Sequence, residues 1–167
     1  MSPTPTAEPQ FRRMSRRDIP TLVKISRDNM AQIVRSAWGT EWRDDTLLQA
    51  ITDPDGFTEI TELNGEIAGY YTVFNNADSV FIISIQLRRR YQNKGLGATM
   101  MSRIEEWGRR HGLGTVELWV QSTNEAALGF YEHLGYTTLR RQGNNYFMRK
   151  PLRPDLRGGG SHDRASS

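Results

Sequence analysis

Apolar residues recur along this chain at two different spacings, and each spacing predicts one kind of element. A spacing of three to four residues is typical of a helix with one buried face. It predicts helices over residues 19–38, 44–51, 95–111 and 125–134. Asp18 precedes the first of these helices as an N-cap, Pro20 falls in its first turn, and Gly39 is placed to end it.

Short runs rich in Val, Ile, Phe and Tyr predict strands. They cover residues 11–14, 57–63, 66–74, 79–87, 115–120, 136–140 and 145–148. Asn64-Gly65, between the second and third runs, is a strong hairpin signal. Hairpins therefore precede and follow a strand–helix–strand crossover. This order predicts an α/β fold with a mixed sheet of about six to seven strands and helices on both faces.

The length of 167 residues suits a single domain. We expect that domain to cover residues 11–152. Residues 1–10 contain three prolines, and residues 153–167 contain the run Gly158–Gly160. Both ends are therefore expected to be flexible tails.

Composition excludes several classes of function. The absence of cysteine rules out disulfides, thiolate metal sites and a cysteine nucleophile, and the three histidines are too dispersed in sequence to suggest a metal site. A net charge of +3 with one basic run, Arg88–Arg90, lacks the density expected of a nucleic-acid binder. No stretch approaches the ~20 apolar residues of a membrane span, and the N-terminus lacks a secretory signal. We expect a cytoplasmic protein without nucleic-acid or membrane partners.

A glycine-containing loop lies between the strand that ends near Leu87 and the helix that begins near Gly95. Helix N-termini offer unpaired N–H groups and the positive end of the helix dipole, and small residues let an anion approach the backbone. Arg88–Arg90 and Lys94 add positive charge. The loop therefore predicts a phosphate site, although a plain strand-to-helix turn is the alternative. Its residues are Gln92, Asn93, Lys94, Gly95, Leu96, Gly97 and Ala98.

A second pattern follows about 30 residues later, at the start of the next helix. Ala127, Phe130, Tyr131 and Leu134 lie on one face of this helix, Asn124 precedes it, and Gly135-Tyr136 follow it. Each part also has an ordinary structural explanation. Ser122-x-x-Glu125 alone reads as a capping box, and Tyr131 alone as a core aromatic.

Together the two patterns resemble the GNAT superfamily of N-acetyltransferases. Gln92, Gly95 and Gly97 match its Q/R-x-x-G-x-G/A signature, and the second pattern matches N-x-x-A-x-x-x-Y-x-x-x-G-F/Y. Arg89 stands where the family usually has proline. The resemblance covers residues 11–151 and implies a GNAT fold that binds acetyl-CoA. The implied cofactor-binding residues are Ile85, Gln86, Leu87, Gln92, Asn93, Lys94, Gly95, Leu96, Gly97, Ala98, Asn124, Ala127 and Tyr131.

The resemblance also implies roles in direct acetyl transfer to a primary amine. The backbone N–H of Leu87 would bind the thioester oxygen, and Tyr131 would act as the general acid that protonates the leaving thiolate. The base is not implied, because Phe81, Ile82 and Trp119 stand where some members carry a glutamate. A chain of water molecules or a carboxylate from elsewhere would have to serve, and four carboxylates remain open, each with the alternative of an ordinary surface charge. They are Glu41, Glu59, Glu62 and Glu117.

The acceptor is indicated only weakly. Trp38, Glu41 and Trp42 could form an aromatic box for a cation, or both tryptophans could pack on the sheet. Asp44 and Asp45 make this segment acidic, which favours a positively charged acceptor. We expect a small amine or amino-acid-like acceptor. The alternatives are a peptide acceptor, as in an N-terminal or lysine acetyltransferase, and a non-catalytic CoA-binding regulatory module. A homodimer is compatible with the sequence, which does not determine the oligomeric state.

Overall fold

The computed structural model describes residues 7–152, so most of the two predicted tails, residues 1–6 and 153–167, lies outside the described residues. The predicted order of elements is confirmed, with two added 3-10 turns at Arg16–Asp18 and Arg89–Tyr91. The helices are α1 (Ile19–Trp38), α2 (Asp44–Thr52), α3 (Leu96–Arg110) and α4 (Glu125–His133). The strands are β1 (Gln10–Arg13), β2 (Gly56–Leu63), β3 (Glu66–Asn76), β4 (Ser79–Leu87), β5 (Thr115–Gln121), β6 (Thr137–Gln142) and β7 (Asn145–Pro151).

The N-terminal segment differs from the prediction in two details. Gln10 was assigned to the tail, but it begins β1 and pairs with Glu62 of β2. Asp18 does precede α1, yet its carboxylate does not cap that helix. It accepts hydrogen bonds from the Ser15 N–H at 2.7 Å and from the Arg12 guanidinium at 2.8 and 3.0 Å. A buried carboxylate is satisfied best by a charged partner, and Arg12 supplies one.

All seven strands form one mixed sheet in the order β1-β2-β3-β4-β5-β7-β6. Every neighbouring pair is antiparallel except β4 and β5, which are parallel. The crossover between these two strands is α3. It is an amphipathic helix whose apolar positions Leu96, Met100 and Ile104 are buried against the sheet.

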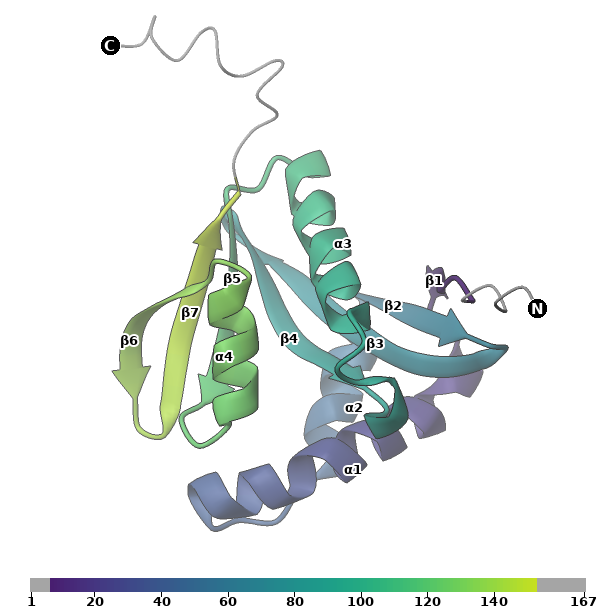
Figure 1. Ribbon diagram of the computed structural model, residues 1–167, viewed down its shortest axis with the longest axis horizontal. Coiled ribbons are helices and arrows are strands. Elements are labelled where there is room, and N and C mark those ends of the chain that lie inside the picture. The colour runs from purple at the N-terminus through teal and green to yellow at the C-terminus, as the bar shows by residue number, and fades with distance from the viewer. Residues whose placement is uncertain (1–6, 153–167) are drawn as a thin grey trace, which may run out of the picture.

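Helices cover the two faces of the sheet unequally (Figure 1). α3 and α4 lie on one face, where a large apolar cluster includes residues of β3, β4, β5 and β7. α1 and α2 lie on the other face, and their cluster with the sheet reaches only Ile60 of β2 and Tyr70 of β3 among its buried residues. The half of that face formed by β5, β7 and β6 is not covered by a helix in the described chain.

Candidate active site

The site lies where β4 and β5 separate. Their last paired residues are Ile82 and Leu118, although β4 continues to Leu87 and β5 to Gln121. The register between β3 and β4 slips by one residue at this point, which leaves Ile83 as an extra residue in β4. Such a bulge bends its strand. β4 therefore turns away from β5, and a cleft of about 630 Å³ opens between them.

This cofactor cleft brings together most of the residues predicted to bind the cofactor. Only Lys94 and Leu96 do not line it, since Lys94 is exposed and the Leu96 side chain packs in the core. The predicted residues that line it are Ile85, Gln86, Leu87, Gln92, Asn93, Gly95, Gly97, Ala98, Asn124, Ala127 and Tyr131. The prediction missed the contribution of α1, from which Asn29, Met30 and Ile33 also line the cleft.

The loop at the mouth of the cleft has the backbone that an anion site needs. Gly95 precedes α3 with a φ of 85°, a left-handed conformation in which a side chain is strained, although space around it is open. At Gly97 a Cβ atom would lie 3.2 Å from Phe130 of α4, so glycine lets the two helices approach. The first amides of α3 lack helical partners and carry the positive end of its dipole, which suits a pyrophosphate.

The end of β4 is held so that its amides face the cleft. The Arg88 N–H donates to the Ala68 carbonyl at 2.8 Å, so Arg88 and Ala68 form a hydrogen-bonded pair of the antiparallel ladder between β4 and β3. Hydrogen-bonded and non-hydrogen-bonded pairs alternate along an antiparallel ladder. The N–H groups of Leu87 and Ile85 therefore point away from β3, toward the gap between β4 and β5. The Leu87 carbonyl is fixed by Asn29 Nδ2 at 2.7 Å and by Gln92 Nε2 at 3.0 Å.

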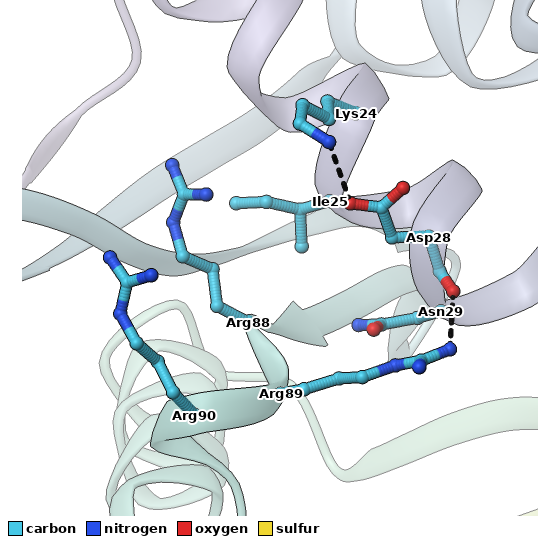
Figure 2. Close-up of a pocket in the computed structure, with 7 residues that line it drawn as sticks. All are labelled: Lys24, Ile25, Asp28, Asn29, Arg88, Arg89 and Arg90. Atoms are coloured by element: carbon cyan, nitrogen blue, oxygen red, sulfur yellow. Dashed lines mark hydrogen bonds and ion pairs between the residues drawn. The ribbon is translucent and has the colours of Figure 1, made fainter.

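The basic run beside the loop points elsewhere than the sequence suggested. Arg88 Nε donates to the Ile67 carbonyl at 2.6 Å, Arg90 pairs with Glu66, and Arg89 donates to the Asp28 carbonyl at 2.9 Å. Figure 2 shows Arg88 and Arg90 directed to one side and Arg89 to the other. The run thus ties the turn after β4 to α1 and β3. Of its three arginines only Arg89 lines the cofactor cleft.

Tyr131 enters the cleft from α4. It is only 8% exposed, and burial raises its pKa to about 12, so the hydroxyl keeps its proton at neutral pH. A buried tyrosine hydroxyl usually has a hydrogen-bond partner. Within residues 7–152 the Tyr131 hydroxyl has none, whereas the other four buried tyrosines each have at least one. Those pairs are Tyr70 with Ser26 and Ser84, Tyr71 with Glu59, Tyr91 with Glu66, and Tyr136 with Glu105.

Comparison with known proteins identifies this arrangement. Residues 21–136 match the Acetyltransferase (GNAT) family. The chain belongs to the GNAT family of acetyltransferases. Acetyl-CoA is therefore its co-substrate. The cleft has unpaired helix amides at one end and an apolar, strand-lined gap at the other.

Individual relatives of this GNAT protein differ in what they are named for. It is 28% identical over 141 residues to an uncharacterized N-acetyltransferase in the pepI 3′ region of Lactobacillus delbrueckii subsp. lactis, covering 74% of this chain and 82% of that protein. It is 30% identical over 94 residues to the ribosomal protein bS18-alanine N-acetyltransferase of Escherichia coli, covering 55% of this chain and 62% of that protein. Its fold resembles that of spermidine N-acetyltransferase from Vibrio cholerae in complex with CoA and spermine, with a TM-score of 0.67, 18% identity, and coverage of 86% and 95%.

The four candidate bases of this GNAT protein lie in different settings. Glu59 is buried and accepts from Tyr71 at 2.9 Å and from Arg103 at 2.6 and 2.9 Å. Glu62 pairs with Arg12, and Glu41 pairs with Arg35 at the surface. Glu117 accepts no hydrogen bond from residues 7–152, and its nearest cation is Arg149 Nε at 3.6 Å. Of the four, Glu117 alone lines a hollow that shares Trp119 with the cofactor cleft.

The predicted aromatic box is not assembled. Trp38 is 42% exposed, whereas Trp42 packs against the α1–α2 cluster and donates from Nε1 to Asp44 at 2.6 Å. Glu41 pairs with Arg35, and neither it nor the tryptophans line the cofactor cleft. The box does not form because Trp42 buries part of its ring against this cluster, and burial of apolar surface is favourable.

The acidic character expected of this segment is also cancelled. Asp44 is paired with Arg27 at 2.7 Å, and Asp45 with Arg43 at 2.7 Å. The arginine partner in each case lowers the pKa of the carboxyl, so both pairs stay ionised and neutral overall. A positively charged acceptor gains little from carboxylates that are already satisfied.

Two further observations concern metal sites and membrane-spanning helices. Within residues 7–152, no group of three or more His, Asp or Glu side chains is placed to hold a metal ion. No helix of the same range has the length and apolarity to cross a lipid bilayer.

Proposed function

We propose that this protein transfers the acetyl group of acetyl-CoA directly to a primary amine of a small, amino-acid-like molecule. The supporting observation is Tyr131, a buried side chain in the cofactor cleft whose hydroxyl has no hydrogen-bond partner within residues 7–152. A hydroxyl in this setting is available to a group that arrives with the ligand. The absence of cysteine supports direct transfer, since the most capable covalent carrier is missing.

The cleft supplies donors for the charge that develops. Acetyl-CoA brings an activated thioester. The amine nitrogen forms a C–N bond to the acetyl carbon as the C–S bond breaks, the amine loses one proton, and the thiolate gains one. The inward N–H groups of Leu87 and of Ile85 are proposed to bind the thioester oxygen. Ile85 lies deeper, nearer the point where β4 and β5 separate, and therefore joins Leu87 as a candidate.

Tyr131 is proposed to give the thiolate its proton. A phenol with its ordinary pKa is a weaker acid than a thiol by about 1.5 units, so the transfer costs about 2 kcal/mol. Burial raises the pKa of Tyr131 to about 12. The same apolar surroundings also disfavour a thiolate, so the difference between the two groups changes less than either value.

Glu117 is proposed to take the amine proton, directly or through a water molecule. A lysine-like amine needs about 4–5 kcal/mol to lose its proton at neutral pH, so a base close to the acceptor is useful. Glu117 is paired in register with Phe81 of β4, one of the positions where the sequence lacks the glutamate of some relatives. A neighbouring strand can therefore provide the carboxylate that β4 does not.

A peptide acceptor is the second candidate. It is favoured by the similarity to an enzyme named for an alanine of a ribosomal protein, and by the helix-free half of the sheet, which leaves room for a larger acceptor. Release of free CoA should be followed with a panel of amines, amino acids and peptides. Release with at least one of them is expected. Binding of acetyl-CoA without release for any acceptor would instead identify a non-catalytic module.

A further inference from the structure

The uncovered half of the sheet carries a second hollow, here called the acceptor hollow. Its volume is about 520 Å³, and every residue that lines it belongs to a strand. Trp119 lines both this hollow and the cofactor cleft, so the two spaces share one side chain as a wall. The lining residues are Asn76, Phe81, Glu117, Trp119, Leu139, Arg140, Phe147 and Arg149.

The strand register explains why these residues meet. Trp119 of β5 lies opposite Phe147 of β7, which lies opposite Arg140 of β6. The three side chains form a row that begins beside the gap between β4 and β5 and ends at the edge of the sheet. The β6–β7 register slips between Thr138 and Arg140, leaving Leu139 as an extra residue. This bulge places consecutive side chains, Leu139 and Arg140, along the same hollow.

Arg140 is held by aromatic rings rather than by a carboxylate. Its Cζ atom lies 4.4 Å from the centre of the Phe147 ring and 5.4 Å from that of Trp119, whose rings are themselves 5.0 Å apart. No carboxylate within residues 7–152 pairs with it. A guanidinium held against ring faces keeps its N–H groups available, and the planar fork of those groups suits a bidentate anion.

The charges in the hollow favour an acceptor with an anionic end. Arg140 and Arg149 face one carboxylate, Glu117, and the acidic segment near Trp42 is neutralised by its own arginines. A polyamine would bring positive charge to a hollow that already has an excess of it. A carboxylate would meet Arg140, two strands away from the gap where the amine reacts. Two strand spacings correspond to about 10 Å, and the Arg140 side chain leans back over part of that distance.

We propose that the acceptor is an amino acid, whose carboxylate binds Arg140 while its amine reaches the gap beside Trp119. This inference rests on the proposed function and specifies its substrate. Arg140 is then the residue that determines specificity, and it takes no part in the bond changes.

The test compares each protein amino acid with its α-carboxamide as acceptor, for the unaltered protein and for Arg140→Gln. A hydrogen bond to a charged group contributes about 1.5–3 kcal/mol, so kcat/KM should favour the amino acid by about 10-fold or more. Arg140→Gln should raise KM for the amino acid about 10-fold, leave kcat nearly unchanged, and remove the preference over the amide.

Arg141→Gln is the matched control. Arg141 adjoins Arg140 but stacks on Tyr146, which packs against the α3–α4 side of the sheet, and its Nε donates to the Gly143 carbonyl at 2.9 Å. It should retain the preference for the amino acid.

Three outcomes would overturn the inference: equal use of acid and amide by the unaltered protein, a preference that survives in Arg140→Gln, or CoA release only with amines that lack a carboxylate. The last result would leave the proposed function intact. Acetyl-CoA binding without release for any amine would overturn both.

Discussion

The groups packed around α1 and those around the acceptor hollow differ in how completely they are hydrogen-bonded. Under α1, the Tyr70 hydroxyl meets both Ser26 and Ser84, and Arg12 meets Asp18. On the uncovered half, the Glu117 carboxylate and the buried Nε of Arg149 lie 3.6 Å apart as an ion pair, and neither has a hydrogen-bond partner in the described chain. Folding normally pairs such groups. Groups that it leaves without a hydrogen bond beside a cleft are therefore the best candidates for contact with a ligand.

Changing Gly95 should have the largest effect, because Gly95 lies in the loop that leads from β4 into α3 and so connects the two halves of the sheet. Gly95→Glu adds strain at a φ of 85° and a negative charge at the start of α3, and is expected to weaken acetyl-CoA binding by about 100-fold or more. Calorimetry would measure the affinity. Gly112→Glu is the control, since Gly112 has a φ of 71° and open space, but lies beyond the other end of α3. Equal thermal stabilisation of both variants by the cofactor would show that the loop assignment is wrong.

Tyr131→Phe tests the contrast between buried tyrosines whose hydroxyls have a hydrogen-bond partner and Tyr131, whose hydroxyl has none. It should lower kcat by about 10-fold or more and leave the affinity for acetyl-CoA nearly unchanged. Tyr136→Phe is the counterpart, because the Tyr136 hydroxyl donates to Glu105 at 2.9 Å. That variant should lose stability, by about 1.5–3 kcal/mol in urea unfolding, yet keep its turnover once folded. Unchanged turnover in Tyr131→Phe would remove the role of general acid.

Glu117→Gln should reduce kcat/KM by about 10-fold at neutral pH. The loss should shrink as the pH approaches the pKa of the acceptor amine, because the free amine then needs no base. A pH–rate profile measures both effects. Glu62→Gln, which changes a part-exposed partner of Arg12 at the far edge of the sheet, should follow the unaltered profile. A reduction of kcat/KM that is the same at every pH would show that Glu117 has a structural role instead.

Asp18→Asn should leave activity almost unaffected and change stability alone. Arg12 lowers the pKa of this carboxyl from 3.8 to about 2. A lowered folded-state pKa contributes stability that is present above about pH 4 and is lost as the pH falls toward 2. The free energy of unfolding at pH 7 should therefore drop by about 2 kcal/mol, with the two proteins converging in acid. A constant difference down to pH 2 would contradict this account.

Local patterns were enough to predict most of the fold and the residues around the loop. The helical spacing in α3 and the Asn64-Gly65 turn both act over a few residues, so the sequence carries them directly. The bulge at Ile83 could not be predicted, because it depends on how β3 and β4 align. The family resemblance indicated Tyr131, whereas its missing hydrogen bond became visible only when the other buried tyrosines could be compared.

The acceptor side was the hardest to predict from sequence. Trp38, Glu41 and Trp42 are close together in the chain and suggested a box, but Trp42 packs, partly buried, against the α1–α2 cluster. The row from Trp119 through Phe147 to Arg140 joins three strands whose order in the sheet differs from their order in the chain. The spacing of residues within one strand cannot predict a row that crosses three strands.

The short parallel pairing of β4 with β5 has a mechanical consequence. Four residue pairs form that seam, and beyond it the inward amides of β4 have no neighbouring strand. An extended ligand that accepts hydrogen bonds from the N–H groups of Ile85 and Leu87 would take the place of a neighbouring strand and link β4 to β5. Hydrogen exchange should therefore slow in β5 as well as in β4 when acetyl-CoA is added, which would make the bound molecule a temporary part of the sheet.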